Sequence, residues 1–143
     1  MLISQISVFL ENRKGRLYEV CSVLGKAAVN IKALTIAESN DFGILRIVTD
    51  KTDDALKVLK ASGFTADVTE IVAVEVDDDP GGLAKILKVI DDNDINLEYM
   101  YGFVEKHTDK ALMVFRFEDP KKAVEVLSTN KINTVKLKDI AVL

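Results

Sequence analysis

Two hydrophobic patterns alternate along the chain, one with a period of two residues and one with a period near 3.6. Ile6, Val8 and Leu10 occupy every second position, which is typical of a strand with one buried face. The apolar residues between positions 17 and 24 then follow the spacing of an amphipathic helix. The two patterns recur downstream, and we expect each half of the chain to read strand–helix–strand–strand–helix–strand.

The other elements are placed by turn and capping signals. In the second half, Asp79-Pro80 and Asp119-Pro120 each predict a helix start, with Asp as N-cap and Pro as the first helical residue. In the first half, Gly63 is expected to close the second helix. The remaining segments are expected as strands over residues 30–36, 43–48, 64–69, 72–76, around 99–101, and over 111–117 and 132–137, and as helices around residues 55–59, 83–90 and 123–127.

The pattern repeats with a constant offset of 66 residues, which relates Gly15 to Gly81 and Asn30 to Asn96. We therefore divide the chain into repeats 1–70 and 71–143. Residues 68–76 contain no Gly, Pro or Ser, so we expect the repeats to pack side by side rather than to hang on a flexible tether. The predicted fold is α+β, with two ferredoxin-like βαββαβ repeats whose antiparallel sheets carry helices on one face.

Composition narrows the class of protein. Of 143 residues, 48% are hydrophobic and 29% are charged, an ordinary globular balance that excludes a disordered or disulfide-framework protein. The formal net charge of −4 argues against nucleic acid or an anionic membrane as the main partner. The single cysteine cannot form an internal disulfide, and no apolar run approaches the roughly 18 residues of a membrane span. We expect a cytoplasmic protein.

The turn between the first strand and first helix of each repeat is the strongest candidate site. Gly15 marks it in the first repeat, and Gly81 and Gly82 mark it in the second. Helix N-termini leave backbone N–H groups unpaired, which suits a carboxylate or phosphate, and glycine lets a ligand approach closely. The alternative is that the glycines only form a tight turn or let the helix pack on the sheet.

Asn30 and Asn96 precede the second strand of each repeat. Each side chain offers an amide to a small polar ligand if the glycine turn lies close by. The alternative is a helix C-cap or a turn residue in the left-handed conformation.

Together these turns and asparagines resemble the ACT domain, in two tandem copies that cover essentially the whole chain. The resemblance implies a non-catalytic regulatory protein that binds an amino acid or a related small ligand. It also implies that such domains pair edge to edge, commonly into an eight-stranded sheet, with the effector at the interface. The ligand-binding positions that it carries over are Asn12, Arg13, Lys14, Gly15, Asn30, Ile31, Asp78, Asp79, Pro80, Gly81, Gly82, Asn96 and Leu97.

The two first loops differ in charge. The first is basic, with Arg13, Lys14 and Arg16, and the second is acidic over residues 77–79. We expect one loop to dominate binding or the two to prefer different ligands. Equal weakening of one ligand by Gly15→Val and Gly81→Val would contradict this asymmetry.

No catalytic, metal or cofactor site is expected. His107 falls in a polar hairpin tip, and Cys21 lies on the apolar face of a predicted helix. The aspartates at 77–79 and 91–94 lack the distal Glu of a calcium loop. Strand alternation places Tyr99 and Tyr101 on one sheet face and Met100 on the other, which favours sheet packing over pocket lining.

Three other classes of function remain. An RNA-binding module would share this order of elements, but it needs aromatic platforms, for which Phe115 and Phe117 are the candidates. A small phosphoryl or acyl-phosphate hydrolase would use Arg13 and Asn30, although no base accompanies them. A protein-interaction module without a ligand is the third. For the regulator, the expected partners are the effector, a second copy in a homodimer, and a metabolic enzyme or transcription regulator.

Overall fold

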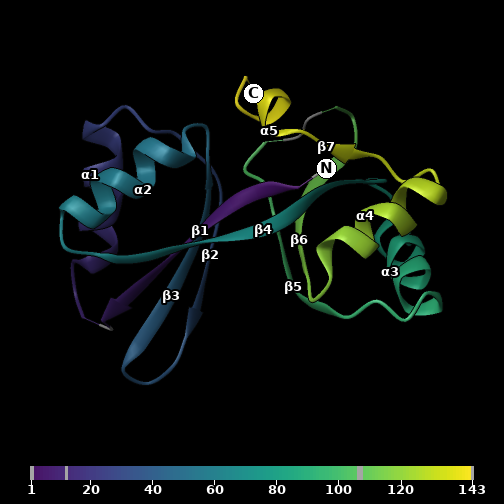
Figure 1. The fold of residues 1–143 in the computed structure, drawn as a ribbon, viewed down its shortest axis with the longest axis horizontal. Coiled ribbons are helices and arrows are strands. Elements are labelled where there is room, and N and C mark those ends of the chain that lie inside the picture. The colour runs from purple at the N-terminus through teal and green to yellow at the C-terminus, as the bar shows by residue number, and fades with distance from the viewer. Residues whose placement is uncertain (1, 12, 106–107, 143) are drawn as a thin grey trace. The chain divides into compact units, whose positions relative to one another are not determined.

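The computed structural model describes residues 2–11, 13–105 and 108–142 (Figure 1). The chain forms two compact units, Ser4–Thr69 and Glu70–Leu143, the latter joined by the start of the chain, Met1–Ile3. We call them the first and second units. Among the described residues, no helix is both long and apolar enough to cross a membrane.

The first unit is a sheet with the strand order β2-β3-β1-β4 and two helices. Strands β1 and β2 both pair with β3 in antiparallel fashion, with Val8 opposite Leu45 and Ile36 also opposite Leu45. The central strand β3 therefore aligns the apolar residues of its neighbours on one face. The elements are β1 (Ile3–Glu11), α1 (Arg16–Lys26), β2 (Ile31–Glu38), β3 (Phe42–Thr49), α2 (Thr52–Ala61) and β4 (Thr65–Val76).

Helices α1 and α2 lie side by side over that face (Figure 1). Val20 and Leu24 of α1 and Leu59 of α2 are fully buried against the strands. The predicted 3.6-residue pattern of both helices is thus their contact with the core. Ile6, Val8, Leu10, Leu45 and Ile47 supply the strand side of this core.

The second unit repeats the arrangement, with the strand order β7-β4-β6-β5. Strand β4 passes from the first unit into the second without interruption, and its last residues, 72–76, pair with β6. Phe115 and Phe117 lie in the core under the helices. The elements after β4 are α3 (Gly82–Asp92), β5 (Leu97–Gly102), β6 (Ala111–Phe117), α4 (Pro120–Thr129), β7 (Thr134–Val135) and α5 (Leu137–Ile140).

One of the two predicted Asp-Pro helix starts is confirmed and the other is wrong. Asp119 caps α4, because its Oδ1 accepts a hydrogen bond of 3.2 Å from the backbone N–H of Lys122. Helix α3 instead begins at Gly82, with Gly81 as N-cap at φ 84°. The chain turns through a left-handed residue before α3, so Asp79 falls two residues short of the capping position.

The predicted last strand over residues 132–137 is also wrong in extent. Only Thr134 and Val135 form a strand, and they pair with Val74 and Ala73. The short helix α5 begins at Leu137 and buries Ile140 completely. Burial of Ile140 is achieved by this helical turn, which the period-two pattern of the segment did not reveal.

Gly82 packs too closely on the chain to carry a side chain. A Cβ at this position would collide with the carbonyl group of Asp77, whereas a Cβ at the helical Gly25 would meet open space. The cost of a glycine in the first helical turn is thus explained by packing inside the second unit.

We predict opposite effects for alanine at these two glycines. Gly82→Ala should lower the free energy of unfolding by about 1–3 kcal/mol, because the backbone must shift to admit the methyl group. Gly25→Ala should raise it by up to about 1 kcal/mol, since alanine favours an exposed helical position. Urea denaturation of both variants measures the two effects, and a Gly82→Ala protein as stable as the parent would contradict the packing argument.

Candidate functional site

The two glycine turns adopt the same conformation. Gly15 and Gly81 are the N-caps of α1 and α3, with φ of 92° and 84°, and a Cβ at either would meet nothing within 4 Å. Positive φ accounts for glycine at both positions, and the open space leaves both turns accessible. Asn12, which the resemblance also places in this loop, lies outside the described residues.

The predicted asparagines lie far from these turns within their own units. Asn30 lies level with Asp50, whereas the first loop leaves β1 at Glu11, opposite Phe42. Phe42 is the first residue of β3 and Asp50 directly follows its last residue, so the two lie about 26 Å apart along the strand at ~3.3 Å per residue. Ile31 is at the same end as Asn30, opposite Thr49. One unit therefore does not bring its glycine turn and its asparagine together.

Both asparagines form hydrogen bonds that connect the start of the second strand of their unit to the end of the third strand. The backbone N–H of Asn30 donates to Asp50 Oδ1 at 2.9 Å, and the Asp50 N–H donates to the Asn30 carbonyl. The side-chain amide of Asn96 donates a hydrogen bond of 3.1 Å to Glu118 Oε2. Leu97, the next residue in the chain, lies at the same end of the sheet. Neither asparagine is a helix C-cap, since the left-handed residues after α1 and α3 are Ala28 and Asp94.

A small pocket of about 110 Å³ lies beside the first loop of the first unit. It mixes basic, acidic and apolar side chains, and the β2–β3 hairpin forms one wall. Pairing of β1 with the start of β3 brings that hairpin to the loop, which is why Ile36, Glu38 and Phe42 join the site although their sequence carries no motif. We call it the first-loop pocket, and its lining is Leu10, Glu11, Arg13, Arg16, Leu17, Ile36, Glu38, Phe42 and Gly43.

The arginines of this pocket differ in how firmly they are held. Arg13 is well exposed and makes a 3.4 Å ion pair with Glu11. Arg16 is only 17% exposed, with a guanidinium nitrogen 2.8 Å from Glu19 and its guanidinium carbon 4.4 Å from the ring centroid of Phe64. Arg16 is therefore part of the packing of the first unit, whereas the ion pair of Arg13 is open to solvent.

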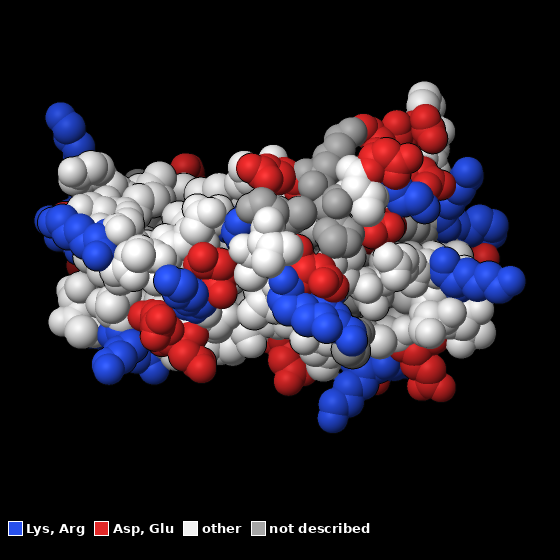
Figure 2. Space-filling model, turned by 90° about the horizontal axis from the view of Figure 1, so that it is seen from above, with Lys and Arg blue, Asp and Glu red and all other residues white. Residues whose placement is uncertain are grey.

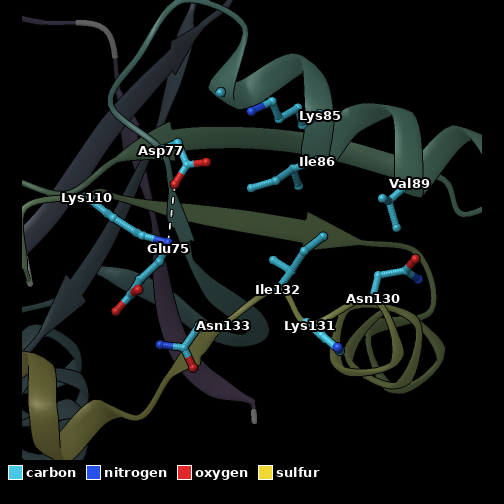
Figure 3. Close-up of a pocket in the computed structure, with 11 residues that line it drawn as sticks. Glu75, Asp77, Lys85, Ile86, Val89, Lys110, Asn130, Lys131, Ile132 and Asn133 are labelled. Carbon is cyan, nitrogen blue, oxygen red and sulfur yellow. Dashed lines mark ion pairs between the residues drawn. The ribbon is translucent and has the colours of Figure 1, made fainter.

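A larger pocket of about 280 Å³ lies in the second unit, between α3 and the segment that joins α4 to β7 (Figure 3). Ile86 extends from α3 and Ile132 from the opposite segment, so the middle of the pocket is apolar. We call it the α3 pocket, and its lining is Glu75, Asp77, Gly82, Lys85, Ile86, Val89, Lys110, Asn130, Lys131, Ile132 and Asn133.

One ion pair closes one side of the α3 pocket. Lys110 Nζ lies 3.2 Å from Asp77 Oδ1, as the dashed line in Figure 3 marks. The hydrogen bond to the Asp77 carboxylate raises the pKa of Lys110, with the charge of Glu75 acting in the same direction. Of the predicted ligand-binding residues in the second loop, Gly82 lines this pocket, whereas Asp78, Asp79, Pro80 and Gly81 are exposed and do not.

Side chains of the types that bind metal ions are dispersed in the part of the chain that the structure describes. No group of three or more His, Cys, Asp or Glu side chains there is placed to hold a metal ion. Cys21 is a half-buried free thiol on α1. His107 lies outside the described residues.

The aromatic residues of β5 and β6 are used for packing. Tyr99 and Tyr101 stack with ring centroids 6.4 Å apart, while Met100 packs against the helix-covered core, so the predicted alternation is confirmed. Phe115 and Phe117 are 0% exposed and cannot stack on bases. On the face shown in Figure 2, Lys and Arg are interspersed with acidic and uncharged surface rather than forming a basic stripe.

Two βαββαβ units with matching glycine turns define a tandem pair of ferredoxin-like domains. This chain belongs to the ACT family: the family model described as an ACT domain pair matches residues 1–143. The comparison with curated proteins found no significant match.

Two solved structures illustrate the similarity. The protein BT0572 from Bacteroides thetaiotaomicron is 39% identical, with a TM-score of 0.93 over 100% of this chain and 98% of that chain. The ligand-free regulatory subunit of aspartate kinase from Thermus thermophilus is 14% identical, with a TM-score of 0.63 over 90% of this chain and 96% of that chain. The second likeness concerns the fold.

We predict that the two arginines of the first-loop pocket contribute unequally to stability. Arg16→Gln should lower the free energy of unfolding by about 1–2 kcal/mol, because it removes the contact with Phe64 and the pair with Glu19. Arg13→Gln should change it by less than about 0.5 kcal/mol, as expected for an exposed pair. Thermal unfolding of both variants tests this, and equal effects would contradict it.

Proposed function

We propose that the protein is a non-catalytic regulator that binds an amino acid at the first-loop pocket. The observation that carries the proposal is the charge pattern of this pocket. Arg13 is available to a ligand carboxylate, and Glu38, across the pocket lining, is available to an ammonium group. Leu10 and Leu17 line the same space and suit an apolar side chain.

A second domain is expected to complete the site. About 110 Å³ is well below the roughly 300 Å³ of a typical ligand pocket, so one unit does not enclose an amino acid. Strand β2 is the edge of the first unit's strand order. Leu34 and Ile36 on it are each 40% exposed, although their partners Ile47 and Leu45 are in the core. Such an apolar edge favours pairing with the same edge of a second copy, which gives a homodimer.

A ligand at such an interface would favour the paired arrangement over others, which is how a regulator transmits its signal. The Thermus thermophilus protein that shares this fold is named a regulatory subunit of aspartate kinase, and its name agrees with the regulatory role proposed here. We expect the signal to reach a metabolic enzyme or a transcription regulator in the cytoplasm.

The geometry weakens the competing functions. The two aromatic residues that an RNA-binding sheet would use, Phe115 and Phe117, are buried in the core. Arg13 and Asn30, which a small hydrolase would use together, lie at opposite ends of the first unit's sheet. A protein-interaction module without a small ligand remains the alternative, because the apolar β2 edge favours it as well.

We predict that one or a few amino acids stabilise the protein. A ligand at about 100 times its Kd adds about 2.7 kcal/mol to the free energy of unfolding. That corresponds to roughly 5–10 °C in a thermal-shift screen of the twenty amino acids and their 2-oxo acids. Arg13→Gln and Glu38→Gln should each abolish the shift, whereas Lys57→Gln, on the exposed face of α2, should leave it unchanged. No shift with any compound would favour the protein-interaction alternative.

We predict that the β2 edge holds the homodimer. Ile36→Lys should convert a dimer to a monomer, because the new charge would be buried at the pairing edge. Sedimentation of the parent and the variant measures this, with Tyr18→Lys as a control, because Tyr18 is an exposed residue of the same unit that does not line the first-loop pocket. A dimer that survives Ile36→Lys would place the interface elsewhere.

A further inference from the structure

The α3 pocket has a counterpart in the first unit, and the two can be compared residue by residue. The offset between the units is 66 residues up to the second strand and 68 from the third strand onward, since Val8 pairs with Leu45 and Val74 with Met113. Gly82 therefore corresponds to Arg16, Lys85 to Glu19, Lys131 to Gly63, and Ile132 to Phe64.

In the first unit this place is filled by the protein itself. Arg16 extends over the ring of Phe64, 4.4 Å from its centroid, and is held at 2.8 Å by Glu19. A cation, an aromatic ring and a carboxylate thus occupy the space between α1 and the segment after α2.

In the second unit the counterparts of Arg16, Phe64 and Glu19 are all different residues. Gly82 has no side chain, and its approach to the Asp77 carbonyl excludes one. Ile132 is smaller than the phenylalanine it replaces, and Lys85 reverses the charge of Glu19. The result is an open pocket of about 280 Å³. The two units share the fold, but this space is filled by side chains in the first unit and open in the second. The cavity therefore does not follow from the fold alone.

The charges of the open pocket favour an anion. Lys110 is paired with Asp77, but no described residue forms an ion pair or side-chain hydrogen bond with Lys85 or Lys131. Lys131 also has φ of 58°, a left-handed conformation that the first unit gives to Gly63. A lysine at a backbone position that favours glycine supplies a second free cation to the pocket.

The two free lysines stand on opposite rims. In Figure 3, Lys85 extends from α3 on one side, Lys131 lies at the end of α4 on the other, and Ile86 and Ile132 lie between them. Apart from the carboxylates of Glu75 and Asp77 on the side of Lys110, the lining is thus cationic at Lys85 and Lys131 and apolar between them. A molecule that matches it carries a negative charge at each end of a short hydrocarbon chain.

We propose that the α3 pocket binds a short aliphatic dicarboxylate, with one carboxylate at Lys85, the other at Lys131 and the chain against Ile86 and Ile132. The site lies within one ACT unit and uses none of the residues of the first-loop pocket. It is therefore a second effector site, independent of the amino-acid site proposed above.

The test is calorimetric titration of the full chain with glutarate at constant ionic strength. Glutarate should bind, and pentanoate and 1,5-pentanediol, which lack one or both charges, should bind at least tenfold more weakly. Lys85→Glu and Lys131→Gly, which install the residues of the first unit, should each weaken glutarate binding at least tenfold. Lys121→Glu is the matched control, since it makes the same charge change on the exposed face of α4 and should leave the affinity unchanged.

A cavity-filling variant guards against a purely electrostatic effect. Ile132→Phe restores the aromatic residue of the first unit and should remove glutarate binding without lowering the melting temperature. The proposal is overturned if glutarate does not bind at millimolar concentration, or if pentanediol binds equally well. It is equally overturned if Arg13→Gln rather than Lys85→Glu abolishes binding, because the ligand would then occupy the first-loop pocket. The result of the amino-acid screen does not bear on this test, because the two pockets share no lining residue.

Discussion

Each unit depends on covering one face of an antiparallel sheet with two amphipathic helices. The helices bury few residues each, such as Val20 and Leu24 on α1 and Ile86 and Ile90 on α3, but these meet a continuous apolar strand face. A unit of about 70 residues has a small core, so nearly every inward position is needed for packing. Function is therefore left to what the helices do not cover, namely loops, edges and the gaps at helix ends.

The gap beneath the first helix of each unit shows how this freedom is used. One unit closes the gap with Arg16 over Phe64, and the other leaves it open beside Gly82 and Ile132. The strand and helix pattern is the same in both, although Phe64 belongs to the core of the first unit and Ile132 packs against the core of the second. Duplication thus preserved the fold while the two copies diverged at a position where a side chain either fills space or leaves it.

The sequence predicted most of the fold, because the fold rests on periodicity and on turn residues that act locally. The strands around Val8 and Leu45, the helices and the Asp119 cap all follow from such local signals. The start of α3 was misplaced because a left-handed glycine N-cap competes with Asp-Pro, and local propensity does not decide between them. The last strand was predicted too long and α5 was missed, because burial of Ile140 depends on distant parts of the chain.

The candidate sites were less accessible to sequence reasoning. The glycine turns were found because they recur, but Glu38 and Phe42 join the first loop only through the register of β1 with β3. That register also separates Asn30 from Gly15, which no spacing rule reveals. The α3 pocket arises from missing volume at Gly82 and Ile132, and a cavity leaves no motif in a sequence.

Strand β4 has an evolutionary consequence. It is one uninterrupted strand from Thr65 to Val76, and it supplies a strand to the sheet of each unit. Insertions are therefore expected to accumulate at hairpins and helix ends rather than at the junction, where they would interrupt this strand.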